Sequence, residues 1–94
     1  MSETIRESRQ RKRDKSLNVG LENWIMAGRI LAIVNANSAP IKRMIKQARE
    51  GNVLIDATSG KPTRSVIIAD SKHVILSSIS PRNLSARMEK NVLG

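Results

Sequence analysis

The sequence predicts a small α+β domain in which a mainly antiparallel sheet carries one central and one C-terminal helix. Three observations support this fold class. The chain has 94 residues, a length that allows one small domain. Short aliphatic runs typical of strands occupy 17–34 and 53–79. Helix-start signals open two further segments, 38–51 and 80–94. Strands and helices therefore follow one another in groups, as they do in α+β domains.

The first predicted strand spans 17–21, where apolar residues alternate with other residues. Glu22 and Asn23 predict a turn after it. The next run, 24–34, is rich in Ile, Leu and Val and predicts a bent or interrupted strand. Gly28 lies inside this run, where an isolated glycine indicates a bulge or a close backbone approach.

The central helix is predicted to begin after Ser38, a good N-cap, with Pro40 in its first turn. The helix is predicted to end at Gly51. One stripe of this helix is apolar: Ile41, Met44, Ile45 and Ala48. The neighbouring stripe is basic: Lys42, Lys46 and Arg49, with Arg43 farther round. A basic stripe of this kind is most often the solvated face of an amphipathic helix.

A second group of strands follows. The strands 53–57 and 64–69 flank a polar loop, 58–63, and together they predict a hairpin with a basic tip. A turn at 70–72 leads to another strand, 73–79.

Ser80 and Pro81 then predict the start of the C-terminal helix by the same signal of a cap followed by proline. Its apolar face is formed by Leu84, Met88 and Val92.

The chain divides into a basic arm, 1–16, and one domain, 17–94. The arm carries six basic and three acidic residues and almost no apolar ones, so it cannot bury itself and is predicted to be disordered. The domain carries eleven basic and five acidic residues and is therefore basic without the arm.

Composition argues against an enzyme or a metal protein. Cysteine is absent, which excludes thiol catalysis and Cys-based zinc sites and fits a reducing cytoplasm. The single histidine, His73, cannot form a multi-histidine site, and no two acids form a recognisable general acid/base pair. Asp56, inside an apolar run, is read as an edge or hairpin position whose carboxylate accepts hydrogen bonds from the backbone. We expect no catalytic residue, metal, cofactor or small-molecule substrate. The aliphatic runs are too short to cross a membrane.

The formal charge of +9 predicts a polyanionic partner, with nucleic acid first and an anionic membrane surface second. The only aromatic residue is Trp24. Proteins that bind single strands usually stack bases on exposed rings, so duplex DNA is the favoured partner. A membrane surface is disfavoured because no helix pairs a basic face with aromatic anchors.

Three cations are the candidate DNA-binding residues. Arg29 interrupts an apolar run, where it is either a contact residue on one sheet face or an ordinary solvated strand residue. Lys61 and Arg64 flank Pro62. They are either part of an ordinary soluble turn or cations that follow a phosphate backbone or enter a groove.

Six strings of the sequence carry a family resemblance, and their spacing is kept across 17–88. The strings are NVG (18–20), AGRI (27–30), SAPIKRMI (38–45), LIDATxG (54–60), TRxVI (63–67) and DSxHVILS (70–77). Together they resemble the RemA family of small bacterial regulators of extracellular-matrix and biofilm genes.

The resemblance implies a cytoplasmic, nucleoid-associated transcriptional regulator with a fold similar to LytTR-type DNA-binding domains. It also implies a ring-like homo-oligomer that presents a repeated basic surface to double-stranded DNA. The family's functional arginine in its AxR string corresponds to Arg29. Its GRRTR-like string corresponds to 60–64, so Lys61 and Arg64 take the places of its first and last arginines. Pro62 is a departure that removes one cation and stiffens the loop.

Two other functions stay open on the sequence. One is a small basic protein associated with RNA or the ribosome. The other is a scaffold that binds a protein partner through exposed aliphatic strands.

Overall fold

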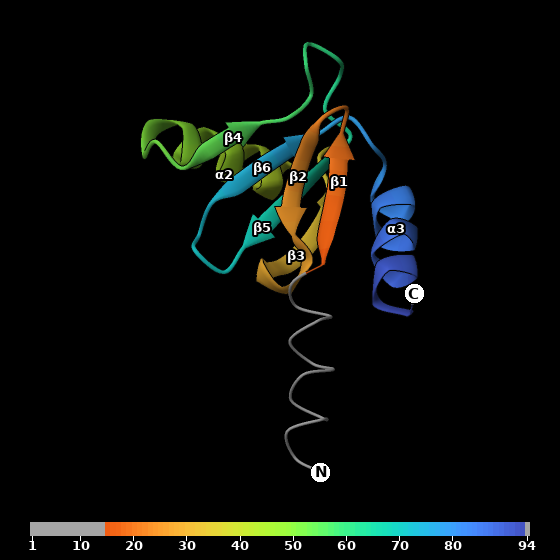
Figure 1. Ribbon diagram of the computed structural model, residues 1–94. Coiled ribbons are helices and arrows are strands. Elements are labelled where there is room, and N and C mark those ends of the chain that lie inside the picture. The colour runs from red at the N-terminus through yellow and green to blue at the C-terminus, as the bar shows by residue number, and fades with distance from the viewer. Residues whose placement is uncertain (1–14, 94) are drawn as a thin grey trace.

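The computed structural model describes residues 15–93, so the predicted arm lies almost entirely outside the described residues. The elements are β1 (Ser16–Gly20), β2 (Asn23–Met26), the 3-10 helix η1 (Ala27–Arg29), β3 (Ile30–Asn35), α2 (Ala39–Glu50), β4 (Leu54–Asp56), β5 (Ser65–Ala69), β6 (Val74–Ser77) and α3 (Pro81–Leu93) (Figure 1).

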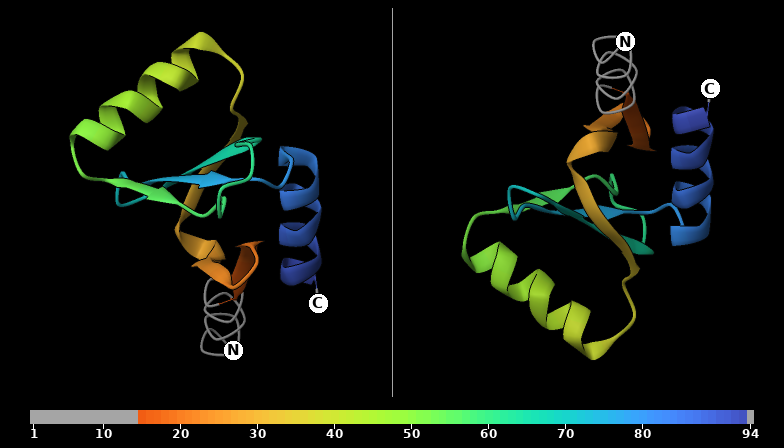
Figure 2. Two further views of the ribbon diagram at one scale, coloured as in Figure 1. Left: turned by 90° about the horizontal axis from the view of Figure 1, so that it is seen from above. Right: turned by 90° about the horizontal axis from the view of Figure 1, so that it is seen from below.

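A four-stranded sheet forms the middle layer of the molecule, with the strand order β3-β5-β6-β4. The pairs β3–β5 and β5–β6 are antiparallel, and only β4 and β6 run parallel. Helix α2 covers one face, the β1–β2 hairpin covers the other, and α3 stands at the side (Figure 2). The predicted α+β class with a mainly antiparallel sheet is confirmed, while the likeness to LytTR-type domains stays a prediction.

Strand β5 supplies both hydrophobic cores because its side chains alternate between the two sheet faces. Val66 packs into the cluster under α2, and Ile67 packs into the cluster under the hairpin and α3. Both side chains are fully buried. The second cluster also holds Leu17 from β1 and Leu84 from α3. The small hairpin and the C-terminal helix are therefore parts of the same core.

Both predicted helix starts are confirmed. The Ser38 hydroxyl accepts a hydrogen bond from the Ile41 N–H at 3.4 Å, and the Ser80 hydroxyl accepts one from the Asn83 N–H at 3.3 Å. The predicted apolar stripe of α2 packs against the sheet. The side chain of Val92 lies outside the described ones. Within residues 15–93, no helix is long and apolar enough to span a membrane.

The predicted interrupted strand 24–34 is confirmed as β2 and β3, separated by η1. Gly28 lies within η1, and the irregular pairing falls instead between Ile30 and Ala32 of β3. Arg29 therefore ends a helical turn, and its prediction as a strand residue was wrong.

The predicted hairpin of 53–57 with 64–69 is also wrong. Strand β5 pairs with β3 along one edge and with β6 along the other, so no edge is left for β4. Strand β4 adds to the outer edge of β6, in parallel. The chain must then pass from one side of β6 to the other, and residues 57–64 make this connection (Figure 1). We call residues 57–64 the basic loop.

Two buried polar contacts and one glycine hold the hairpin and the sheet in place. The Ser77 hydroxyl donates to the Val19 carbonyl at 2.6 Å, and the Ser65 hydroxyl donates to the Ile79 carbonyl. Gly20 has a φ of +142°, and a Cβ there would lie 3.0 Å from the Ala57 carbonyl oxygen. Only glycine meets both requirements without strain.

We expect Leu84→Ala to lower the free energy of unfolding by about 2–5 kcal/mol, because it removes a fully buried side chain that anchors α3. Urea denaturation measures this loss. Ser85→Ala, on the exposed side of the same helix, is the control and should change stability by less than about 0.5 kcal/mol. Equal effects of the two substitutions would contradict the packing described for α3.

Candidate nucleic-acid interface

Arg29 is held at the start of β3 by two contacts with Asp70. Its Nε donates to the Asp70 Oδ1 at 2.7 Å, and its carbonyl accepts from the Asp70 N–H at 2.8 Å. Both side chains are exposed, so the ion pair contributes little to stability. It does orient the guanidinium. Because the pair uses Nε, the two terminal amino groups stay available to an external acceptor such as a phosphate.

The contact between Arg29 and Asp70 was not predicted from the sequence. The two residues are 41 positions apart and meet because β3 and β5 pair with Ile30 opposite Ala69. Only a correct strand register would have revealed the contact, and the sequence contains no local signal for it.

The first anchor of the basic loop is Asp56, at the end of the edge strand β4. Its Oδ1 accepts a hydrogen bond from the Thr58 hydroxyl at 2.6 Å and another from the Thr58 N–H at 2.9 Å. These bonds favour the ionised carboxylate and lower the pKa of Asp56, with a smaller contribution from the positive charge of Arg49. The prediction of an edge position satisfied by the backbone is confirmed, and Asp56 therefore has a structural explanation.

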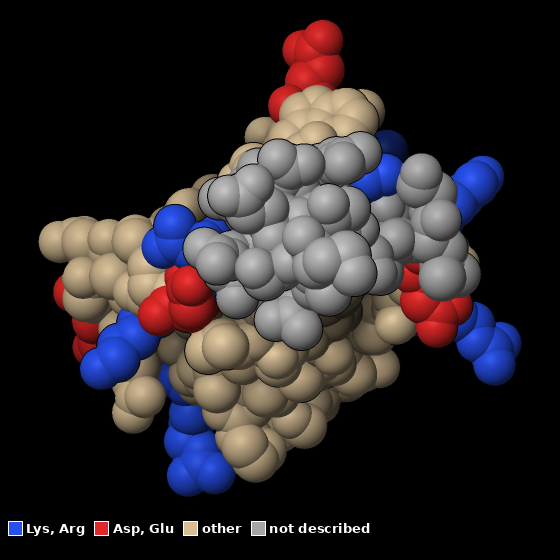
Figure 3. Space-filling view, turned by 60° about the horizontal axis from the view of Figure 1, so that its bottom comes forward, with Lys and Arg blue, Asp and Glu red and all other residues tan. Residues whose placement is uncertain are grey.

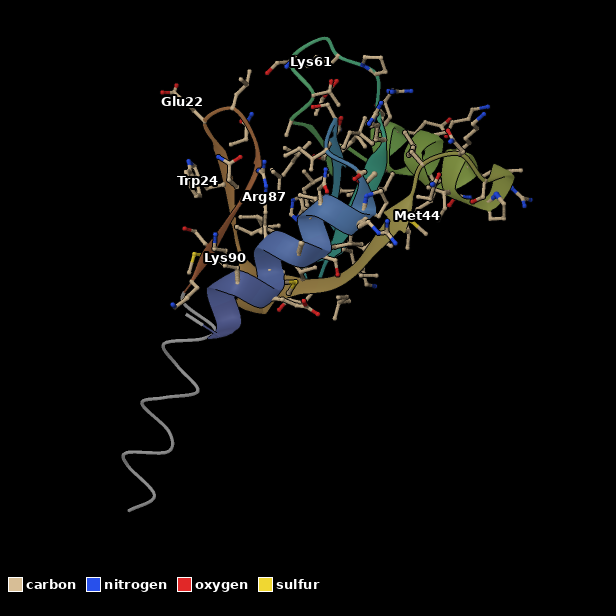
Figure 4. All side chains as sticks on the ribbon, turned by 90° about the vertical axis from the view of Figure 1, so that its right-hand side faces the viewer. Glu22, Trp24, Met44, Lys61, Arg87 and Lys90 are labelled. Atoms are coloured by element: carbon tan, nitrogen blue, oxygen red, sulfur yellow. The ribbon has the colours of Figure 1, made fainter. Side chains whose placement is uncertain are left out.

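Lys61 stands at the outer end of the basic loop (Figure 4). The Lys61 N–H donates to the Thr58 carbonyl at 3.0 Å and closes a tight turn. Within this turn Ser59 and Gly60 have φ values of +53° and +83°. Left-handed backbone is easiest for glycine, which explains Gly60 at this position. The turn leaves the Lys61 side chain exposed to solvent.

The second anchor of the basic loop is the backbone of Arg64. Its N–H donates to the Ser77 carbonyl at 2.8 Å, and its carbonyl accepts from the Ala36 N–H at 3.2 Å. Arg64 is thus fixed between two neighbouring segments while its side chain remains exposed. The loop that carries Lys61 and Arg64 is tied to the sheet at both ends.

A single copy of the chain does not bring the three predicted cations together. Arg29 precedes the first residue of β3, whereas Arg64 bonds to Ala36 just beyond the last. About six residues separate these points along the strand, which corresponds to roughly 20 Å. Lys61 and Arg64 therefore form one group, and Arg29 lies at the opposite end of the sheet.

Other cations surround these two groups. The predicted basic stripe of α2 is confirmed as exposed: Lys42, Arg43, Lys46 and Arg49. On the face shown in Figure 3, the Lys and Arg side chains that can be seen lie at separate places around the rim. The positive charge visible on this face is therefore divided among several small groups.

His73 has a local role at the turn between β5 and β6, where its Nδ1 lies 2.7 Å from the Ser71 hydroxyl. Among residues 15–93, no group of three His, Cys, Asp or Glu side chains could hold a metal ion.

Comparison with known proteins points to one family of regulatory proteins. A family model described as RemA-like, "Extracellular matrix regulatory protein A-like", matches residues 16–88. A relative from Halalkalibacterium halodurans is 54% identical over 74 residues, which cover 79% of this chain and 85% of the relative. A relative from Alkaliphilus oremlandii is 53% identical, with 79% and 80% covered. A third, from Brevibacillus brevis, is 51% identical, with 79% and 86% covered. Each is named "Putative regulatory protein".

We expect Thr58→Val to raise the pKa of Asp56, because the substitution removes the hydroxyl bond that does most to lower it. An NMR titration of the Asp56 carboxyl carbon measures the change. The bonds to the ionised form stabilise the loop above pH 3.8, the ordinary pKa, and this stabilisation is lost as the pH falls through the lowered value. Ser59→Ala is the control and should leave the pKa of Asp56 unchanged. An unchanged titration in Thr58→Val would show that the hydroxyl does not hold the carboxylate.

Proposed function

This chain belongs to the RemA-like family of regulatory proteins, and on that premise we propose that it is a DNA-binding transcriptional regulator. It acts as a ring-like homo-oligomer in the cytoplasm, at the nucleoid, and its targets are genes of the extracellular-matrix and biofilm type. The names of its relatives describe regulators, which agrees with a function in binding rather than in catalysis.

The observation that carries the proposal is the anchored basic loop. Lys61 and Arg64 are exposed cations on a loop whose two ends are hydrogen-bonded to the sheet. A cation on a fixed backbone loses less conformational entropy when it meets a phosphate than a cation on a mobile tail. Such a loop suits the phosphate backbone of a duplex or the edge of a groove.

Repetition of the subunit compensates for the few contacts that each copy makes. One copy offers the pair Lys61 and Arg64 at one end of the sheet and Arg29 at the other. A ring multiplies these contacts, and linked contacts raise the apparent affinity steeply. Bending DNA along such a surface costs on the order of 1–6 kcal/mol. Counterion release from several phosphates per subunit offsets this cost.

Binding to duplex DNA should weaken steeply with salt, with a slope of log affinity against log salt of about −5 or steeper, because many phosphates release counterions together. Fluorescence anisotropy of a labelled promoter fragment at several salt concentrations gives the slope. Structured RNA serves as the competitor. A flat salt response would exclude the phosphate mechanism, and preferential binding of RNA would favour an RNA- or ribosome-associated protein.

Arg29→Ala and the double variant Lys61→Ala with Arg64→Ala should each abolish band shifts with DNA while the melting temperature stays unchanged, because all three side chains are exposed. Lys46→Ala with Lys90→Ala is the matched control, since it removes the same two charges from the helices. Figure 4 places Lys90 well away from Lys61. Band shifts that survive in both test variants, or vanish equally in the control, would show that binding depends on total charge or on another face.

A further inference from the structure

Three of the large exposed hydrophobic side chains line one groove. Among residues 15–90, five large apolar side chains are exposed: Leu21, Trp24, Met26, Leu31 and Ile55. Three of them, Trp24, Met26 and Ile55, line a groove of about 580 Å³ between the hairpin and the β4 side of the sheet. We call it the Trp24 groove.

Trp24 is the only aromatic residue of the chain, yet 63% of its surface is exposed. A Trp side chain can bury 150–250 Å² and is among the strongest sources of binding energy at protein interfaces. The cores of this domain are instead filled with aliphatic side chains. A chain that leaves its largest apolar side chain beside an apolar groove has the features of a surface that is covered by a partner.

Another exposed apolar side chain, Leu31, lies on the edge strand β3 and does not line the groove. Leu31 is 70% exposed on β3, while Ile55 belongs to β4, the other edge strand. The pairing of β3 with β5 is irregular between Ile30 and Ala32, so Leu31 is the extra residue at this position. An extra residue of this kind redirects a side chain away from the regular sheet. The chain thus carries a largely apolar groove and a separate exposed apolar side chain that does not line it.

We propose that the Leu31 edge of one copy docks into the Trp24 groove of the next copy. The proposal rests on the homo-oligomer of the proposed function and names the surfaces that build it. The two surfaces differ, so the contact is head-to-tail, and contacts of this type form a ring where the rotation between copies closes. Trp24, Met26 and Ile55, the exposed apolar side chains that line the groove, offer roughly 300 Å² of surface, somewhat less than half of the 800 Å² that each partner buries in a standard interface.

The groove also adjoins a candidate DNA contact, because Arg29 is one of its lining residues. A neighbouring copy in the groove would therefore sit beside this cation, which couples assembly to the DNA-binding surface. The charge of +9 on each copy opposes assembly through repulsion, and salt screens that repulsion. Self-assembly should thus persist or strengthen with salt, whereas binding to DNA should weaken.

The test uses two blocked variants of the full chain, Trp24→Glu for the groove and Leu31→Glu for the Leu31 edge. Light scattering should find each of them monomeric at a concentration where the wild type is oligomeric. An equimolar mixture should form a one-to-one dimer and stop there, because one intact groove and one intact Leu31 edge remain. Leu21→Glu is the matched control. Leu21 is 64% exposed but does not line the groove, so this variant should assemble like the wild type.

The outcomes separate this proposal from the proposed function. Variants that assemble like the wild type, or a mixture that stays monomeric, would overturn the docking mode. A wild type that is monomeric would overturn both the docking mode and the ring. An oligomer that needs Trp24 and Leu31 but ignores DNA would support the docking mode and reject the proposed function. Circular dichroism melting establishes that each variant folds, and Trp24→Gln with Leu31→Gln provides a second, uncharged pair.

Discussion

The burial of β5 on both of its faces is the constraint on which the rest of the structure depends. Val66 and Ile67 point to opposite sides and each enters a separate aliphatic core. With a single aromatic residue in the chain, these cores are filled by branched side chains that must pack closely. The hydroxyls of Ser65 and Ser77 add buried hydrogen bonds at the end of the sheet where the basic loop begins and ends.

The sheet fixes the positions of the charged groups on the surface. Arg29 and the basic loop are fixed at opposite ends of the same strands, so their separation is set by the length of β3. Neither group moves toward the other without disrupting the core. A domain of this kind presents small charged groups at fixed intervals. On the proposed function, tight binding to DNA therefore depends on how many copies are placed side by side.

The sequence was informative where the signals were local. Ser38 with Pro40 and Ser80 with Pro81 marked both helices, because caps and helix-start prolines act within one turn. Prediction from the sequence failed where the structure depended on pairing between distant segments. Short aliphatic strands of similar composition do not indicate which strands they pair with. The predicted partner of β4 was therefore wrong, and the Arg29–Asp70 contact was missed. The sequence named three candidate cations, but it did not show that they lie at two ends of the sheet.

The parallel strand β4 has a consequence for how the domain responds to heat. It is three residues long and is paired along one side only, which makes it the weakest part of the sheet. The basic loop begins where β4 ends, so fraying of that strand releases one anchor of the loop while both cores remain intact. On the proposed function, contact with DNA would then be lost at a lower temperature than the fold itself, because the basic loop would be released before the cores unfold.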